Sequence, residues 1–427
     1  MCAARLTSDG VLISQPVHQH AYETALAAQD GGQLRWFATG MYDTARGLAD
    51  PRLRAWLPAR AGRRIDGGLR RRRHPDLDPA RILTIPRYHL IAMGLSRSVG
   101  RLSQLRRLDL EEWAHHQFDA ELGRRLAKLA GVDLVHAFEG AALATFQAAR
   151  RMGKRTILDV PSAHERYMQV VGESPRPRIG QERLLADLLL APSDFVVTCL
   201  MEAGAPADQI LKIPYGVDPT RFRRQAGMRT DEVFRAVFVG RIQRRKGVSY
   251  LLEAWRRLAL PRAELLVVGA ADAEGRRLLE PYRGICRFAG PHPRHEIHRF
   301  YQQSDVFVFP SLAEGSALVT YEALACGLPL VTTPNSGSVV RDGIDGLVVG
   351  PGDVDGLCER IRFLYDHPEV RRKMGAQGRD LIQRRYTWRH YRQRIGAAYA
   401  AIFEGDDPRP AVENAVAPES GEPGGDR

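Results

Sequence analysis

Two glutamates in the C-terminal half of the chain could bind two parts of one ligand. Glu314 and Glu322 are separated by seven residues. Apolar positions in Ala317–Ala325 recur with helical spacing, so Glu314 precedes a predicted helix and Glu322 lies within it. At this separation the two carboxylates cannot form a close catalytic pair. They can accept hydrogen bonds from hydroxyl groups on two parts of an elongated ligand.

The start of this predicted helix suits a phosphate group. Gly315, Ser316 and Ala317 are small and lie where the first helical N–H groups have no partner within the helix. The positive end of the helix dipole, equivalent to about half a charge, also favours an anion there. A phosphate flanked by hydroxyl-bearing groups is the layout of a nucleotide-sugar.

Two apolar runs enclose the helix and must position it. Val306–Pro310 and Leu328–Thr333 are rich in β-branched and aromatic residues and are predicted to be buried strands. Gly327 and Pro329 end the helix between them. The stretch is therefore predicted to be a strand, a turn, a helix and a strand, which is typical of a doubly wound α/β domain.

A second group of phosphate-binding candidates follows the predicted strand Phe234–Val239. It consists of the pairs Gly240-Arg241 and Lys246-Gly247. Glycine lets the backbone approach a phosphate, and the two basic side chains can offset the charge of a diphosphate leaving group. We expect Arg244 and Arg245, between the two pairs, to be solvated.

These patterns together resemble a known family. E-G-x-A-x-x-x-x-E followed by A-x-G-x-P resembles the E-x7-E signature of retaining glycosyltransferases of family 4, which have the two-Rossmann GT-B fold, and G-R-x4-K-G resembles their phosphate-binding pair. The resemblance implies that Glu314 holds sugar hydroxyls and Glu322 the ribose. It assigns the diphosphate to Gly240, Arg241, Lys246 and the backbone around Gly315, Ser316, Ala317, Leu318 and Val319.

The resemblance also assigns residues outside this core. His164 follows the predicted strand Arg155–Val160, where the family has a histidine that touches the donor sugar beside the reacting carbon. Glu165 and Glu173 lie nearby without a firm register. Arg294 belongs to a loop that resembles the one lying against the nucleotide base.

The composition and the net charge indicate an anionic partner but do not identify it. The 427 residues carry a formal net charge of +12. No aromatic-interleaved basic strand or zinc-finger pattern accompanies this charge, so we do not expect a nucleic acid. The arginine-rich stretch Arg60–Arg73 is either a solvated loop or a surface that meets anionic lipid or a phosphate-bearing acceptor.

Other classes of protein are disfavoured. No run approaches about 18 apolar residues and no signal peptide is recognisable, so we expect a soluble cytoplasmic protein, with membrane association at the arginine-rich stretch as an alternative. Five scattered cysteines indicate neither disulfides nor zinc. Asp76–Asp78 and Asp353–Asp355 both read D-x-D, but the second opens a predicted helix as its cap, so we expect no metal and no cofactor.

The first half has the alternation of a second parallel sheet. We expect helices over Ile82–Arg107 and Leu110–Ala130, and strands over Val11–Ser14, Leu34–Thr39, Val132–Phe138, Arg155–Val160, Asp194–Cys199 and Ile210–Ile213. The loop after the first strand lacks the glycine pair that many family members have there. His18 or His20 could take its place, or could be ordinary loop histidines.

The expected architecture is GT-B, with two Rossmann-like doubly wound domains facing across a cleft. Residues 1–216 would form an acceptor domain, 217–232 a linker, 233–385 the nucleotide-sugar domain, 386–404 a helix crossing back to the first domain, and 405–427 a disordered tail. The expected function is transfer of a sugar, with retention, from a UDP- or GDP-sugar to a glycan, lipid or small-molecule acceptor. The alternatives are a catalytically silent nucleotide-sugar binder and an epimerase or hydrolase of the nucleotide-sugar.

Overall fold

The structure is a computed structural model that describes residues 9–17, 20–42, 72–98, 104–162, 167, 177–223 and 231–416. The chain divides into two compact units. Unit 1 comprises Met1–Val160, Arg176–Leu190 and Arg392–Glu419, and unit 2 comprises Pro161–Pro175, Ala191–Tyr391 and Ser420–Arg427. The domain boundaries expected at 216, 232 and 385 stay a prediction.

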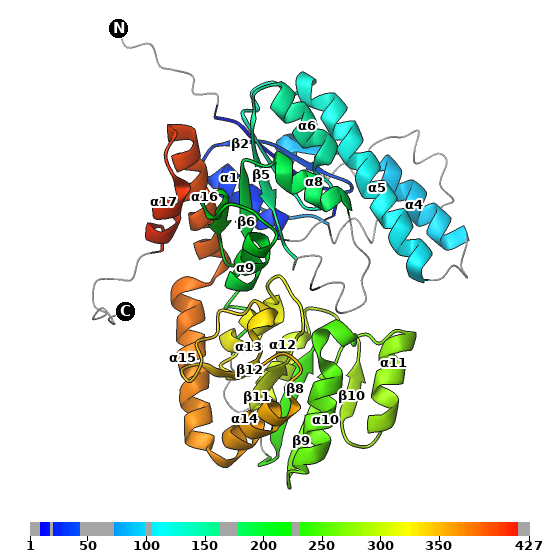
Figure 1. The fold of residues 1–427 in the computed structure, drawn as a ribbon, viewed down its shortest axis with the longest axis vertical. Coiled ribbons are helices and arrows are strands. Elements are labelled where there is room, and N and C mark those ends of the chain that lie inside the picture. The colour runs from blue at the N-terminus through cyan, green and yellow to red at the C-terminus, as the bar shows by residue number, and fades with distance from the viewer. Residues whose placement is uncertain are drawn as a thin grey trace. The chain divides into compact units, whose positions relative to one another are not determined.

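The first sheet is parallel, with the order β3-β2-β1-β4-β5-β6-β7 in the described part of the chain. Its order reverses beside β1, as in a doubly wound fold, and the strands alternate with helices. The strands are β1 (Val11–Gln15), β2 (Leu34–Thr39), β3 (Ile82–Thr84), β4 (Leu134–Phe138), β5 (Arg155–Asp159), β6 (Leu188–Ala191) and β7 (Ile210–Lys212). Among its helices are α1 (Ala21–Asp30), α4 (Arg87–Ser98), α5 (Gln104–Arg125), α6 (Leu143–Arg151) and α8 (Pro177–Leu185) (Figure 1).

Two predictions for this half were wrong. Ile82–Arg107 is not one helix: its first three residues form β3, and α4 begins at Arg87, because Pro86 cannot continue a helix and favours an extended residue before it. Asp194–Cys199 is not a strand but the start of α9 (Asp194–Glu202), whose N-cap Ser193 accepts a hydrogen bond from the Val196 amide. A short buried apolar run does not by itself distinguish a strand from a helix.

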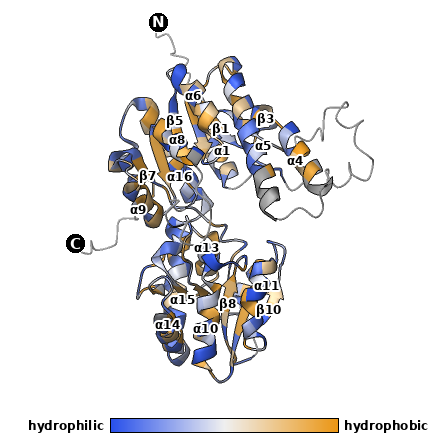
Figure 2. Ribbon diagram, turned by 45° about the vertical axis from the view of Figure 1, so that its right-hand side comes forward, coloured by the Kyte–Doolittle hydropathy of each residue, from blue (hydrophilic) through white to orange (hydrophobic). Residues whose placement is uncertain are grey.

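The second sheet is also parallel, with the order β10-β9-β8-β11-β12-β13 in the described residues. The strands are β8 (Phe234–Val239), β9 (Ala263–Val268), β10 (Arg287–Gly290), β11 (Val306–Phe309), β12 (Leu330–Thr332) and β13 (Gly346–Val348). The helices are α10 (Val248–Leu258), α11 (Ala273–Leu279), α12 (Ile297–Gln302), α13 (Leu318–Ala325), α14 (Val354–Asp366) and α15 (Pro368–Arg385). Figure 2 shows hydrophobic residues concentrated on the strands and hydrophilic ones on the helices. The strands predicted at Phe234–Val239, Val306–Pro310 and Leu328–Thr333 are confirmed as β8, β11 and β12, whereas α15 was not predicted.

The last long helix, α16 (Trp388–Glu404), returns the chain to unit 1 from Arg392 onwards. Arg392 lies 3.8 Å from the Glu23 carboxylate of α1. Deeper in the unit, the Tyr399 hydroxyl lies 2.7 Å from Nδ1 of His136 on β4, and both side chains are buried. The expected helix that crosses back to the first domain is confirmed.

We expect Tyr399→Phe to destabilise unit 1 by about 1–3 kcal/mol, because it leaves the Nδ1 atom of the buried His136 without its partner. Thermal unfolding of the full chain measures the effect. Tyr250→Phe is the matched control, since its partly exposed hydroxyl makes no hydrogen bond to the described residues. Equal melting of the two variants would show that the buried contact contributes nothing.

The prediction of a disordered tail was wrong for residues 405–416. The structure has a helix there, α17 (Pro408–Asn414), whose N-cap Asp407 accepts a hydrogen bond from the Arg409 amide. Pro408 occupies the first helical turn, where proline is favoured, and Val412 and Val416 are buried. The prediction rested on composition and overlooked the capping residue Asp407 and the two buried valines. Residues 417–427 lie outside the described part.

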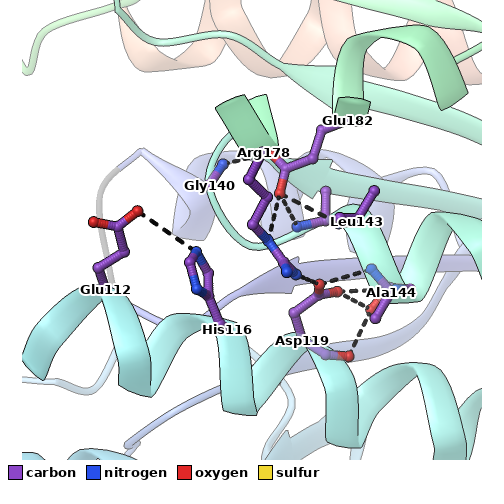
Figure 3. A network of polar contacts seen from close by, with 10 residues as sticks. Glu112, His116, Asp119, Gly140, Leu143, Ala144, Arg178 and Glu182 are labelled. Carbon is purple, nitrogen blue, oxygen red and sulfur yellow. Dashed lines mark hydrogen bonds and ion pairs between the residues drawn. The ribbon is translucent and has the colours of Figure 1, made fainter. Parts of the chain in front are cut away.

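Two buried carboxylates close the N-terminus of α6 (Figure 3). Glu182 of α8 accepts hydrogen bonds from the amides of Gly140 at 2.6 Å, Ala142 at 3.0 Å and Leu143 at 3.2 Å. Asp119 of α5 accepts from the next two amides, at 2.8 and 2.9 Å, and from Arg178. Burial raises the pKa of Glu182 to about 7, although the backbone donors lower it. The helix start is therefore held by groups from two other helices.

This raised pKa makes unit 1 sensitive to pH. The folded pKa of Glu182 is above its unfolded value of 4.5, so its favourable contribution is complete below pH 4.5 and is lost as pH rises through about 7. We expect Glu182→Gln, which cannot ionise, to gain stability relative to the wild type between pH 5 and pH 8, by up to about 3 kcal/mol. Thermal melts across this range measure it, with the exposed Glu111→Gln as control. A gap between variant and wild type that does not change with pH would contradict the prediction.

Candidate active site

The loop after β8 presents basic side chains beside a tight backbone approach. Gly240 donates its amide to Val268 and is followed by Arg241, and a 3₁₀ turn, η4 (Arg244–Lys246), ends at Gly247. Gly247 has a φ of 67°, and a Cβ atom there would lie 1.8 Å from the Pro310 carbonyl oxygen. The close approach that requires this glycine is thus to the loop after β11. The two loops are packed backbone to backbone.

Glu314 lies in the loop between β11 and α13, where its amide donates to Asn335 at 2.9 Å. Its Oε1 atom accepts from Nη1 of Arg245 at 2.6 Å and is also paired with the Lys246 ammonium. The expectation that Arg245 is solvated was therefore wrong, because its side chain folds back onto this loop. Arg244 does face solvent and pairs with Glu274 at 2.7 Å.

The positive charge of the Lys246 ammonium is only partly compensated within this cluster. Burial lowers the pKa of Lys246, the Glu314 carboxylate raises it, and the guanidinium groups of Arg245 and Arg241 lower it again. Arg241 is exposed, and in the described residues it forms no ion pair. Two cations therefore share one carboxylate and a third acts on Lys246, which is an arrangement that an additional anion would stabilise.

The start of α13 has free backbone donors. Its N-cap Ala317 provides no side-chain cap, and neither Leu318 nor Val319 donates its amide to a described residue. The Ala317 amide itself donates to the Ser336 carbonyl at 3.1 Å, and its predicted role in holding a ligand stays a prediction. The Ser316 hydroxyl is likewise engaged, donating to the Gly337 carbonyl at 3.0 Å.

Gly315 is also fixed by its surroundings within unit 2. Its carbonyl accepts from the Ser193 hydroxyl at 2.5 Å, and a Cβ atom on Gly315 would lie 1.7 Å from the Pro161 carbonyl oxygen. The small residue is thus required by backbone packing. This requirement holds whether or not a ligand binds there.

Glu322 lies on α13 and is 5% exposed. The Tyr301 hydroxyl donates to its Oε2 atom at 3.1 Å, and Arg294 lies 3.4 Å from Oε1. Burial raises the pKa of Glu322, and Arg294 and the Tyr301 hydrogen bond lower it. Glu322 and Arg294, predicted separately, are therefore neighbours, whereas the buried partner Tyr301 was missed. The regular spacing of α12 places Tyr301 on its inward face, which was the available signal.

The remaining predicted residues give a mixed result. His164, Glu165 and Glu173 lie outside the described residues, as do His18 and most of Arg60–Arg73. His20 is 6% exposed and its Nε2 atom lies 2.7 Å from the Asp159 carboxylate, which fits the ordinary structural alternative. The side chain of Asp353 caps α14, as expected.

The described residues provide neither a metal-binding cluster nor a membrane-spanning helix. They contain no group of three or more His, Cys, Asp or Glu side chains placed to hold a metal ion. None of the helices in that part of the chain combines the length and the apolar character needed to cross a bilayer.

Two parallel Rossmann-like sheets, with a C-terminal helix that returns to the first, define the GT-B class of folds. Over 93% of this chain and 100% of the other, the fold matches a sucrose-phosphate synthase from Thermosynechococcus elongatus with a TM-score of 0.68 at 19% identity. A structure of Anabaena Alr3699/HepE in complex with UDP-glucose matches over 92% of this chain and 99% of the other, with a TM-score of 0.61 at 14% identity. At these identities the likeness shows the fold alone.

Sequence comparison gives matches to glycosyltransferases. Residues 234–367 match the model described as glycosyl transferases group 1, in agreement with the resemblance noted in the sequence. A D-inositol 3-phosphate glycosyltransferase of Geodermatophilus obscurus is 32% identical over 265 residues, 55% of this chain and 58% of the relative. The chain spans about three fifths of the length of the first curated relatives that it matches.

Proposed function

We propose that the protein transfers a sugar from a nucleoside-diphosphate sugar to an acceptor, with retention of anomeric configuration. The observation that carries the proposal is the cluster in which Arg245 and Lys246 pair with Glu314 and Arg241 acts on Lys246, next to the uncapped start of α13. This cluster combines excess positive charge, free backbone donors and a carboxylate within one unit. A diphosphate attached to a hydroxyl-rich sugar satisfies all three.

The diphosphate would be bound by Arg241, Lys246 and the amides of Leu318 and Val319. These groups would stabilise the charge that develops on the leaving group as its bond to the anomeric carbon breaks. The acceptor oxygen forms the new bond to that carbon, and its proton passes to the departing phosphate, so no base from the protein is assigned. His164 would lie beside the reacting carbon.

The two glutamates would bind the hydroxyl-bearing parts of the donor. Glu314 would accept hydrogen bonds from sugar hydroxyls, and Glu322 from the ribose, with Arg294 near the base. Because Arg294 already approaches Glu322, ribose binding would exchange one polar partner of this buried carboxylate for another.

The nucleotide and the acceptor are proposed at the level of class. One structural neighbour was solved with UDP-glucose, and one relative is named a D-inositol 3-phosphate glycosyltransferase. We propose a UDP- or GDP-sugar donor, which fits the predicted phosphate site, and an acceptor that is a glycan, a lipid or a small molecule. A cytoplasmic enzyme with peripheral membrane contact through Arg60–Arg73 remains part of the proposal.

The test is product analysis. The purified protein is incubated with UDP-glucose and GDP-mannose, with and without a lipid extract, and released nucleoside diphosphate and any epimerised donor are measured. We expect nucleoside diphosphate release that increases with an acceptor. Binding without turnover would favour the silent binder, and an epimer or acceptor-independent hydrolysis would favour the third class.

A further inference from the structure

The two cations that share Glu314 are held in different ways. Arg245 is attached to the loop between β11 and α13 by several contacts: its Nη1 atom also donates to Ala313 at 3.0 Å, and its carbonyl accepts from the Leu312 amide at 2.9 Å and the Ser311 hydroxyl at 3.0 Å. The guanidinium and backbone of one residue thus fasten the whole segment that carries Glu314.

Lys246 has no comparable attachment. Among the described residues, its ammonium is paired with the Glu314 carboxylate and lies 5.4 Å from the centre of the Phe309 ring. Its side chain is 15% exposed, against 23% for Arg245 and 12% for Glu314. A flexible, partly accessible ammonium with one charged partner can move to a stronger anion, whereas a guanidinium with several partners is retained.

One cation could not pair with both the Glu314 carboxylate and a diphosphate. If Lys246 moved to a diphosphate without Arg245 present, the largely buried Glu314 carboxylate would lose the last positive neighbour that it contacts among the described residues. An unpaired buried carboxylate is unfavourable and would compete with the diphosphate for Lys246. With Arg245 in place, Glu314 stays paired and oriented while Lys246 is released.

We infer that Arg245 is a positioning residue: it holds Glu314 in its sugar-binding orientation so that Lys246 is free to bind the diphosphate. This inference rests on the proposed function. The three basic residues of η4 then differ in role: Arg244 faces solvent, Arg245 fixes the Glu314 carboxylate, and Lys246 contacts the leaving group. Loss of Arg245 should therefore weaken the binding of the sugar and, to a smaller extent, that of the nucleoside diphosphate.

The test compares ligands with and without the sugar. Dissociation constants for UDP, UDP-glucose, GDP and GDP-mannose and the rate of nucleoside diphosphate release are measured for the wild type, Arg245→Ala and Arg244→Ala. For Arg245→Ala we expect turnover to fall at least about tenfold and nucleoside diphosphate affinity to fall by a clearly smaller factor. Arg244→Ala removes the same charge one residue away and should match the wild type in both.

Two further variants protect the test against misfolding. Arg245→Gln keeps a donor for Ala313 without the charge and should show the same selective loss, whereas Arg245→Lys should recover part of the turnover. The inference is overturned if Arg245→Gln turns over like the wild type, or if nucleoside diphosphate affinity falls as much as turnover. A wild type that binds none of the four nucleotides would overturn the proposed function as well, so the two failures are distinguishable.

Discussion

Lys246→Ala is expected to slow the release of nucleoside diphosphate by about 10²–10³-fold, the usual effect of removing one preorganised group that stabilises transition-state charge. The fold should survive the change. Glu314 keeps its 2.6 Å contact with Arg245, so no buried carboxylate is left unpaired, and the removed ammonium is itself disfavoured by burial. Steady-state kinetics with the accepted nucleotide-sugar measure the rate, and thermal melting checks the fold.

The control for this prediction is Lys373→Ala, which removes an exposed lysine from α15 in the same unit. Its turnover should equal that of the wild type. If Lys246→Ala keeps a rate within about threefold of the control, the ammonium does not contact the leaving group in the transition state, and the proposed assignment of the diphosphate site is wrong.

Gly247→Ala is expected to destabilise unit 2 by about 3 kcal/mol or more. Two effects combine: a φ of 67° disfavours any residue with a Cβ atom, and that atom would lie 1.8 Å from the Pro310 carbonyl oxygen. Neither backbone can retreat without moving β11 or α10. A loss of this size lowers the melting temperature by about 6–12 °C in a domain of roughly 200 residues, and it should also displace the adjacent Lys246 and reduce turnover.

Gly343→Ala separates the two effects. Gly343 has a φ of 74°, but a Cβ atom there would meet nothing within 4 Å. We expect this control to lose only the backbone term, about 1–2 kcal/mol. If the two variants melt together, the close approach between the loops after β8 and β11 is absent in solution.

The core of the site could be predicted because its signals are local. Two short apolar strands and one helical face bracket Glu314 and Glu322, and a glycine with a proline ends the helix. All of this information lies within the stretch from Val306 to Thr332. The strand Phe234–Val239 was equally legible, since six apolar or β-compatible residues precede a glycine turn.

What the sequence did not reveal depends on partners that are distant along the chain. Arg244 and Arg245 are adjacent and chemically identical, yet only the second meets Glu314, which is 69 positions away. The Ala317 amide is consumed by the Ser336 carbonyl, a contact set by the turn after β12. Side-chain rotamers and backbone pairing between loops decide these outcomes, and neither leaves a periodic pattern in the residues themselves.

The return of α16 to unit 1 has a consequence for synthesis. Tyr399 and Ile395 belong to the buried interior of a unit whose first strand begins at Val11, so the ribosome produces the last part of that interior almost four hundred residues after the first. The nascent N-terminal half emerges early yet must wait, with an apolar face exposed, for a segment translated after the whole of β8–β13. The sheet β8–β13 can therefore fold before the first sheet is complete, which reverses the usual order in which the N-terminal domain folds first during synthesis.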